Sequence, residues 1–291
     1  MNRIAGILLI SISAASFGTL AIIGRFAYAD GMDVTTLLFL RFTIAAILMF
    51  AWMALRREPL PRGRVLLQLA GMGGLGYVGQ SFCYMSAIQY ASTGLVALLL
   101  YLYPVFVTVL TVIVQKKKIT SRTILALVLA TIGAALTANP EGGQLPGILL
   151  AVSAALIYAV YIIVGTDVMK QVSSVQSSAV IFASAAVVFG LMTLIRGAHW
   201  PATQTGWLAV SGIALIATML PVATFLAGLK IVGATDASLL STLEPVVTVI
   251  LAAVIFGEPV LTAMLIGGAL ILAAVVITVQ RQKKPGGNEA T

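Results

Sequence analysis

An acidic residue within an apolar helical stretch offers the clearest chemistry in this chain. Residues 238–259 read SLLSTLEPVVTVILAAVIFGEP, and Glu244 stands near the middle, directly before Pro245. Ser241 and Thr248 flank it at helical spacing, which predicts a polar stripe along one helix face. Three roles are open for the carboxyl group: a site for a proton or cation, a ligand for a substrate amine, and a structural partner of an arginine.

Two prolines predict bends in the helices that carry them. Pro245 cannot donate a backbone hydrogen bond to the carbonyl of Ser241, and Pro104 leaves the carbonyl of Leu100 without its helix partner in the same way. In an apolar environment such a carbonyl is tolerated only against protein or water. We therefore predict that both helices line a central polar cavity, with tighter helix packing as the alternative reason for the bends.

Tyrosines deep inside apolar segments form a second candidate group, because tyrosines of an interfacial belt lie near helix ends instead. Their amphipathic rings suit a substrate with apolar and polar parts. Hydrogen-bonded tyrosines in a packed bundle are the alternative. The residues of this group that share helix faces are Tyr77, Gln80 and Tyr84, then Tyr101 and Pro104, and then Tyr158 and Tyr161.

Two arginines within apolar segments could complement the acid. Arg25 lies near a segment end and can extend its side chain toward water. Arg41 lies deeper, and we predict that it holds neighbouring helix ends together, with cargo binding as the alternative. His199, in the loop RGAHWPATQTG, is predicted to be a solvated loop residue.

The composition determines the class of protein. Of the 291 residues, 60% are hydrophobic and 9% are charged, whereas soluble domains carry about 25% charged residues. This chain must therefore sit in a lipid bilayer. One cysteine, one histidine and the lack of a G-x-x-x-x-G-K-[S/T] loop or a Ser-His-Asp set predict no metal site, no cofactor, no ATP-driven chemistry and no enzymatic activity.

Apolar runs of about 20 residues, separated by short charged or Pro/Gly-rich segments, predict ten transmembrane helices. Lys and Arg concentrate in the loops that a cytoplasmic N-terminus would place inside, so both termini are predicted to be cytoplasmic. The net charge of +8 then marks the cytoplasmic face, and no nucleic-acid partner is expected. The predicted spans are 4–27, 34–55, 65–88, 93–114, 121–138, 147–166, 176–195, 206–229, 235–256 and 260–279.

The two halves of the chain align at an offset of 140 or 141 residues, which pairs Pro104 with Pro245. Five helices per half is an odd number, so the second half must enter the membrane from the opposite side. Many secondary transporters use such inverted repeats. The predicted fold is an all-α polytopic membrane protein, with two inverted five-helix repeats (1–138 and 139–280) around a central cavity and a disordered cytoplasmic tail (281–291).

The segment LEPVVTVILAAVIFGEPVLTAMLIGGALILAAVVI resembles the C-terminal signature of the EamA domain, in the drug/metabolite transporter superfamily. SFGTLAIIGRFA and FLRFTIAAILMF resemble the opening two helices of that domain, so the resemblance covers essentially the whole chain. One departure is that Gly257-Glu258 corresponds to Lys116-Lys117 in the first half, which argues against a transport role for Glu258. The ten-helix layout is similar to that of the YddG-type bacterial amino-acid exporters.

This resemblance implies a secondary transporter in a bacterial inner membrane that exports small amphipathic metabolites, such as aromatic or neutral amino acids, by alternating access. Efflux of another small solute (a drug, nucleoside or sugar derivative) and a channel-like facilitator are the alternatives. The expected partners are the small-molecule substrate and the lipid bilayer. Ten helices can enclose a pathway within one chain, so a monomer would suffice. The residues expected along that pathway are Tyr77, Gln80, Tyr84, Tyr101, Pro104, Tyr158, Tyr161, Ser241, Glu244, Pro245 and Thr248, with Arg41 as a structural charge.

Overall fold

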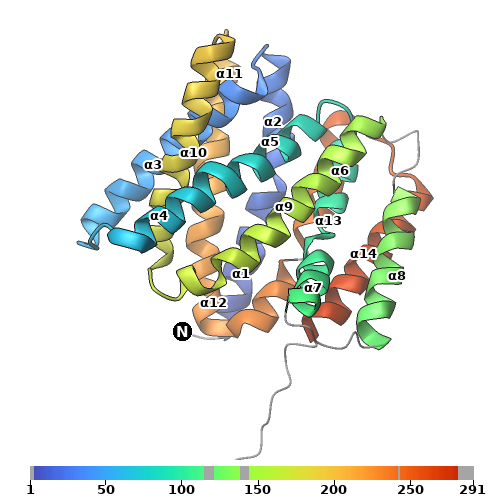
Figure 1. The fold of residues 1–291 in the computed structure, drawn as a ribbon. Helices are drawn as coiled ribbons and strands as arrows, with labels where there is room; N and C mark the ends of the chain where they lie inside the picture. The colour runs from blue at the N-terminus through green and yellow to red at the C-terminus, as the bar shows by residue number, and fades with distance from the viewer. Residues whose placement is uncertain (1–2, 115–120, 138–143, 242, 281–291) are drawn as a thin grey trace, which may run out of the picture.

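The computed structural model describes residues 3–114, 121–137, 144–241 and 243–280, and every regular element within these ranges is a helix (Figure 1). The predicted tail at 281–291 lies outside the described residues. The first half contains α1 (Arg3–Gly18), α2 (Leu20–Ala29), α3 (Val34–Leu55), α4 (Gly63–Gly71), the π-helical turn η1 (Met72–Tyr77), α5 (Val78–Ala87), α6 (Thr93–Leu100), α7 (Tyr103–Val114) and α8 (Ser121–Thr137). The second half contains α9 (Leu145–Met169), α10 (Ser174–Arg196), α11 (Gln204–Ala214), the π-helical turn η3 (Leu215–Met219), α12 (Leu220–Leu240), α13 (Leu243–Phe256) and α14 (Thr262–Gln280).

Length and composition make six of these helical stretches able to cross a membrane, and shorter apolar helices accompany them. Large apolar side chains point outward from the bundle: Leu75 is 79% exposed, Leu194 81% and Ile195 85%. Such a surface is stable only in lipid, because water would make it aggregate. The prediction of an all-α polytopic membrane protein is therefore confirmed. The six stretches are Arg3–Ala29, Val34–Leu55, Thr93–Thr111, Leu145–Gly165, Ser174–Arg196 and Gln204–Phe225.

The proline-linked breaks occur where the sequence predicts them. The fourth predicted span is divided at Tyr101 and Leu102, just before Pro104, and the helix preceding α13 ends at Leu240, just before Pro245. Pro245 has no backbone N–H to donate to the carbonyl of Ser241. This carbonyl instead accepts hydrogen bonds from the Glu244 backbone N–H at 3.1 Å and from the Tyr101 hydroxyl at 2.5 Å. Both bends are thus confirmed, and a side chain from the other half replaces the missing helix donor.

The boundary between the eighth and ninth predicted spans is wrong. The sequence places a loop between 229 and 235, but α12 continues without interruption to Leu240 and α13 has only 14 residues. Lys230 and Gly233 do not stop the helix, because a single glycine costs only about 1 kcal/mol inside a helix. The proline, which removes a donor and clashes with the preceding turn, is the stronger break.

Helices α3 and α10, which correspond in the repeat, run antiparallel along each other. Thr36, at the start of α3, accepts a hydrogen bond from the backbone N–H of His199, just beyond the end of α10, at 3.1 Å. At the opposite end, the hydroxyl of Ser173, which caps α10, donates to the carboxylate of Glu58, just beyond the end of α3. Equivalent helices therefore cross in opposite directions, as an inverted repeat requires.

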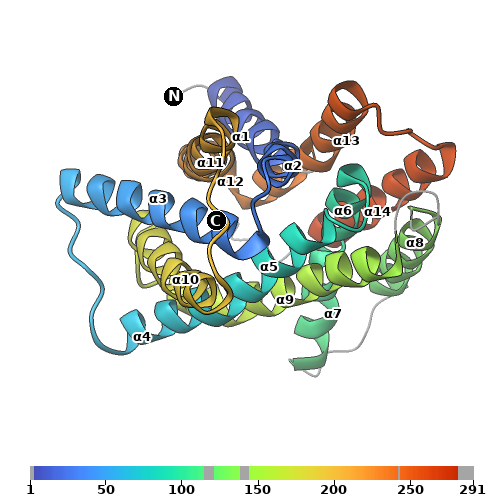
Figure 2. The ribbon, with the colours of Figure 1, turned by 90° about the horizontal axis from the view of Figure 1, so that it is seen from above.

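The packing of the other helices repeats the same relationship. Helix α1 packs against α12, and its counterpart α9 packs against α5, while α8 and α14 pack against each other. Seen from above, α1 and α12 lie on one side of the bundle and α5 and α9 lie on the other (Figure 2). The π-helical turns η1 and η3 also occupy corresponding places in the third and eighth spans. The interior between these pairs is lined by both halves.

Two acidic residues join neighbouring segments at the end of the bundle where α2 ends and α6 begins. Asp30 accepts hydrogen bonds from the Thr203 hydroxyl and from the backbone N–H groups of Ala202 and Thr203, and the Thr203 hydroxyl holds the pKa of this carboxyl below its ordinary value. Glu258 accepts from the backbone N–H groups of Thr93 and Gly94 at 3.1 and 3.4 Å. Glu258 therefore caps the start of α6.

Candidate functional site

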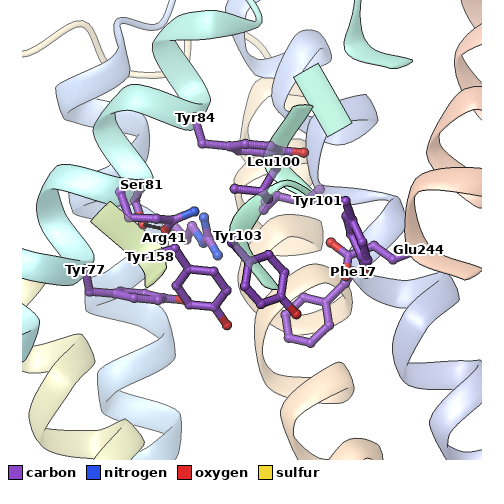
Figure 3. Close-up of a pocket in the computed structure, with 12 residues that line it drawn as sticks. Phe17, Arg41, Tyr77, Ser81, Tyr84, Leu100, Tyr101, Tyr103, Tyr158 and Glu244 are labelled. Carbon is purple, nitrogen blue, oxygen red and sulfur yellow. Dashed lines mark hydrogen bonds between the residues drawn. The ribbon is translucent and has the colours of Figure 1, made fainter. Parts of the chain in front are cut away.

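A cavity of about 120 Å³ lies in the interior between the two halves (Figure 3). In the first half, α3, η1, α5, α7 and the break at Tyr101 supply its polar lining, and α9 and α13 of the second half complete it. Its walls combine one guanidinium group, one carboxyl group, an amide, a serine hydroxyl and five tyrosines. The lining residues are Phe17, Leu20, Arg41, Tyr77, Gln80, Ser81, Tyr84, Leu100, Tyr101, Tyr103, Tyr158 and Glu244.

Tyr101 connects the helix break of the first half to that of the second. Its hydroxyl lies 2.5 Å from the backbone oxygen of Ser241 and 2.9 Å from Oε2 of Glu244. Thr248, one turn further along α13, donates from its hydroxyl to the carbonyl of Gly18 at 2.9 Å and also contacts the carbonyl of Glu244 at 3.1 Å. The start of α13 is therefore fixed against both α6 and α1, and the Glu244 side chain is held at the cavity wall.

Aromatic rings form a continuous row along the cavity. The ring of Tyr103 lies 5.9 Å from that of Tyr101 and 4.8 Å from that of Tyr158, measured between centroids. Tyr161 continues the row, at 6.0 Å from Tyr158 and 5.8 Å from Tyr77. Edge-to-face and offset arrangements at these distances are favourable for aromatic pairs. The row presents ring surfaces and hydroxyl groups together, which suits an amphipathic solute.

Arg41 is buried, at 3% exposure, and lines the cavity from α3. Its Nε donates to the hydroxyl of Thr218 in η3 at 3.1 Å, and Thr218 in turn donates to the carbonyl of Ile213 at 2.9 Å. Its guanidinium carbon lies 4.9 Å from the centroid of the Phe42 ring. Arg41 thus joins α3 to η3 through this hydrogen bond. It also presents its remaining N–H groups to the cavity.

Arg41 and Glu244 do not form an ion pair: within the described ranges, no carboxylate oxygen lies within 4.0 Å of the Arg41 guanidinium. Arg25 does pair with an acid: its Nη1 donates to Oε1 of Glu258. Of the three roles open for Glu244, the structural partnership with an arginine is therefore not the one the structure shows.

A larger hollow, about 760 Å³, lies between α3 and α10, lined by residues such as Phe39, Val187, Leu191 and Trp200. It contains no charged residue, and several lining side chains are exposed on the surface that faces lipid. Acyl chains would fill such a groove in a membrane. The smaller, charged cavity is therefore the candidate site.

Two matches to one family model together cover residues 4–139 and 145–280, and the description of that model is EamA-like transporter family. The chain belongs to this family. The two matched segments account for nearly all of the described helices, in agreement with the repeat seen in the fold.

Relatives of this EamA-family chain are also transporters by name. An uncharacterized transporter of Archaeoglobus fulgidus is 30% identical over 275 residues, which cover 92% of this chain and 94% of the relative. The uncharacterized transporter YcbK of Bacillus subtilis is 23% identical over 301 residues, covering 98% and 96%. A solved crystal structure matches with a TM-score of 0.65 at 21% identity and covers 97% of this chain and 100% of that chain, which shows a shared fold.

Most of the predicted pathway residues meet at the cavity of this EamA-family protein, and the others support it. Tyr161 stacks behind Tyr158, Ser241 contributes its backbone oxygen, and Thr248 links α13 to α1. Pro104 and Pro245 act through the helix breaks. The predicted residues that line the cavity directly are Tyr77, Gln80, Tyr84, Tyr101, Tyr158 and Glu244, together with Arg41.

The sequence did not indicate Tyr103, although its ring lies in the centre of the aromatic row. On a continuous helix, Tyr103 would project to a different face from Tyr101, because residues two apart do not share a face. The break at Tyr101 and Leu102 changes that direction and brings both rings to the cavity. Phe17, Leu20, Ser81 and Leu100 were also missed, and as ordinary residues of apolar helices they carry no distinguishing signal.

Proposed function

We propose that this chain is a secondary transporter that exports small amphipathic metabolites, with amino acids as its cargo, across the inner membrane by alternating access. The observation that carries the proposal is the cavity at the interface of the two inverted halves, where a guanidinium, a carboxyl group and tyrosine rings converge. Substrate sites of inverted-repeat transporters lie at this interface. The similarity of the layout to YddG-type exporters supports the cargo class, and the Lys/Arg distribution supports cytoplasmic termini.

The size and chemistry of the cavity favour a small cargo with polar groups and an apolar part. Ligand pockets usually combine apolar walls with a few placed polar groups. Here Phe17, Leu20 and Leu100 supply apolar contacts, and the tyrosines supply both kinds of contact. A cavity of about 120 Å³ is small compared with most ligand pockets, which span roughly 300–1,000 Å³. Binding of a cargo larger than a few heavy atoms would therefore require the two halves to move apart, as alternating access provides.

The experiment is a counterflow assay with the purified full chain in proteoliposomes. Vesicles preloaded with an unlabelled solute are diluted into medium that contains the same solute in radiolabelled form at low concentration. We expect transient accumulation of labelled aromatic or neutral amino acids, and none in vesicles without protein. Accumulation of nucleosides or sugar derivatives but of no amino acid would overturn the cargo assignment. Uptake of every solute without counterflow would instead indicate a channel-like facilitator.

A further inference from the structure

The Arg41 guanidinium is a buried cation whose charge is not neutralised within the described parts of the chain. Its one hydrogen bond there is from Nε to the Thr218 hydroxyl, a neutral acceptor. Guanidinium stays protonated in proteins, so burial cannot be relieved by loss of the charge. A buried charge is costly unless it is paired. Its position in the wall of the cavity means that an anion entering the cavity would meet its free N–H groups.

Glu244 provides the opposite charge in the same cavity. It comes from α13 of the second half, whereas Arg41 comes from α3 of the first half. In Figure 3 the two side chains are seen on either side of the Tyr103 and Tyr101 rings. The Tyr101 hydroxyl donates a hydrogen bond to Oε2 of Glu244, and among the described residues no donor contacts Oε1. The cavity therefore has one wall suited to an anionic group and another suited to a cationic group.

We propose that the cavity recognises a zwitterion, with the carboxylate of the solute on Arg41 and its ammonium group on Glu244. This inference rests on the proposed function and deepens it, because it states how an amino acid is chosen over solutes with one charge or none. The planar guanidinium matches a carboxylate with two parallel N–H···O bonds. The side chain of the solute extends from its Cα along the tyrosine row. A solute that lacks one charge leaves a buried group of the protein unpaired, and this penalty is the source of the selectivity.

Arg41 and Glu244 belong to different halves of the chain, so a solute that binds both can affect how the halves move. A bound zwitterion contacts α3 of one repeat and α13 of the other, so binding favours a state in which both contacts can form at once. A ligand shifts a conformational equilibrium only through its different affinity for the two states. The two-ended contact provides that difference, whereas a solute held by one charge alone does not.

The test compares three probes: L-phenylalanine (a zwitterion), L-phenylalanine amide (a cation) and N-acetyl-L-phenylalanine (an anion). Each competes for counterflow of labelled L-phenylalanine by the full chain in proteoliposomes, and binding is measured in detergent by calorimetry. For the unmodified protein, we expect both blocked probes to bind at least about tenfold more weakly than the zwitterion, because each leaves one charged group of the protein without its partner.

The variants assign each charge to its partner. In Arg41→Gln, we expect phenylalanine and its amide to bind with nearly equal affinity. In Glu244→Gln, we expect phenylalanine and N-acetylphenylalanine to bind with nearly equal affinity. Arg41→Lys keeps the positive charge and should keep the preference with weaker binding, which covers the case in which Arg41→Gln does not fold. Arg25→Gln, which changes an arginine already paired with Glu258, is the matched control and should keep the full preference.

Folded Arg41 and Glu244 variants with the preference of the unmodified protein would overturn the zwitterion inference while leaving amino-acid transport intact. Absence of counterflow with any amino acid, together with exchange of nucleosides or sugar derivatives, would instead overturn the proposed function. The two failures are therefore distinguishable in one set of vesicles.

Discussion

The Tyr101 hydroxyl lies 2.9 Å from Oε2 of Glu244, and this contact joins the two helix breaks of the protein. The same hydroxyl lies 2.5 Å from the carbonyl oxygen of Ser241. A tyrosine has one hydroxyl proton, so it cannot donate fully to both acceptors at once. When Glu244 is protonated, it can donate to Tyr101 while Tyr101 donates to Ser241. The hydrogen bonding at the breaks is thus coupled to the protonation of Glu244.

Tyr101→Phe removes a side-chain donor that bridges the two breaks. We expect a destabilisation of about 1–3 kcal/mol, because a buried carboxyl group and a backbone carbonyl each lose a donor. Tyr103→Phe is the control, since its ring lies in the same row and the described structure gives its hydroxyl no hydrogen-bond partner. Thermal unfolding in detergent should show a lower melting temperature for Tyr101→Phe. Equal melting temperatures would contradict the bridging role.

Glu244→Gln tests whether this carboxyl group carries a proton during transport. Glutamine keeps an oxygen that can accept from the Tyr101 hydroxyl, but it cannot exchange a proton. We expect the response of the transport rate to a pH gradient across the vesicle membrane to disappear, while exchange without a gradient is retained at a reduced rate. Counterflow with and without an imposed gradient measures both. An unchanged response to the gradient would show that another group couples the proton.

Glu258→Ala is expected to destabilise the protein by about 1–3 kcal/mol, since it removes the acceptor that caps α6. The Thr93 and Gly94 N–H groups lose a charged partner. Arg25→Gln removes the partly exposed ion pair, whose arginine side chain is 44% exposed, and the stacking of the guanidinium on the Phe256 ring, and should cost less than about 1 kcal/mol. Melting temperatures of the two purified variants should therefore differ. A larger loss for Arg25→Gln would mean that the ion pair, and not the cap, stabilises this end.

Gly73→Ala tests the close approach of η1 to α10. A Cβ at Gly73 would lie 2.5 Å from the carbonyl oxygen of Ile181, which is backbone and cannot move aside easily. We expect a cost of about 1–3 kcal/mol, typical of overpacking. Gly71→Ala, two residues earlier, meets nothing within 4 Å and should be neutral or stabilising by about 0.5–1 kcal/mol. If both variants melt at the same temperature, the approach is not as tight as the structure has it.

Sequence patterns indicated the helix breaks and the cavity, but not the direction of every side chain. Pro104 and Pro245 lack a backbone N–H and therefore interrupt helical hydrogen bonding whatever packs around them. Both bends were thus predictable from the sequence. Tyr103 was not predictable, because its direction depends on where the helix stops being regular. The loop expected between 229 and 235 is absent for a related reason. A glycine and a lysine weaken a helix only slightly, so the continuation of α12 was decided by the energy of the whole bundle.

The sequence by itself determined that the chain lies in a membrane, that it consists of helices and that its halves repeat in opposite directions. Each of these follows from properties summed over many residues: the apolar content, the length of each span and the odd number of spans in each half. Only the tertiary structure decided which charges meet. Arg25 pairs with Glu258, while Arg41 and Glu244 remain separate walls of one cavity. Contacts between residues more than 200 positions apart depend on helix packing and rotation, which no local pattern encodes.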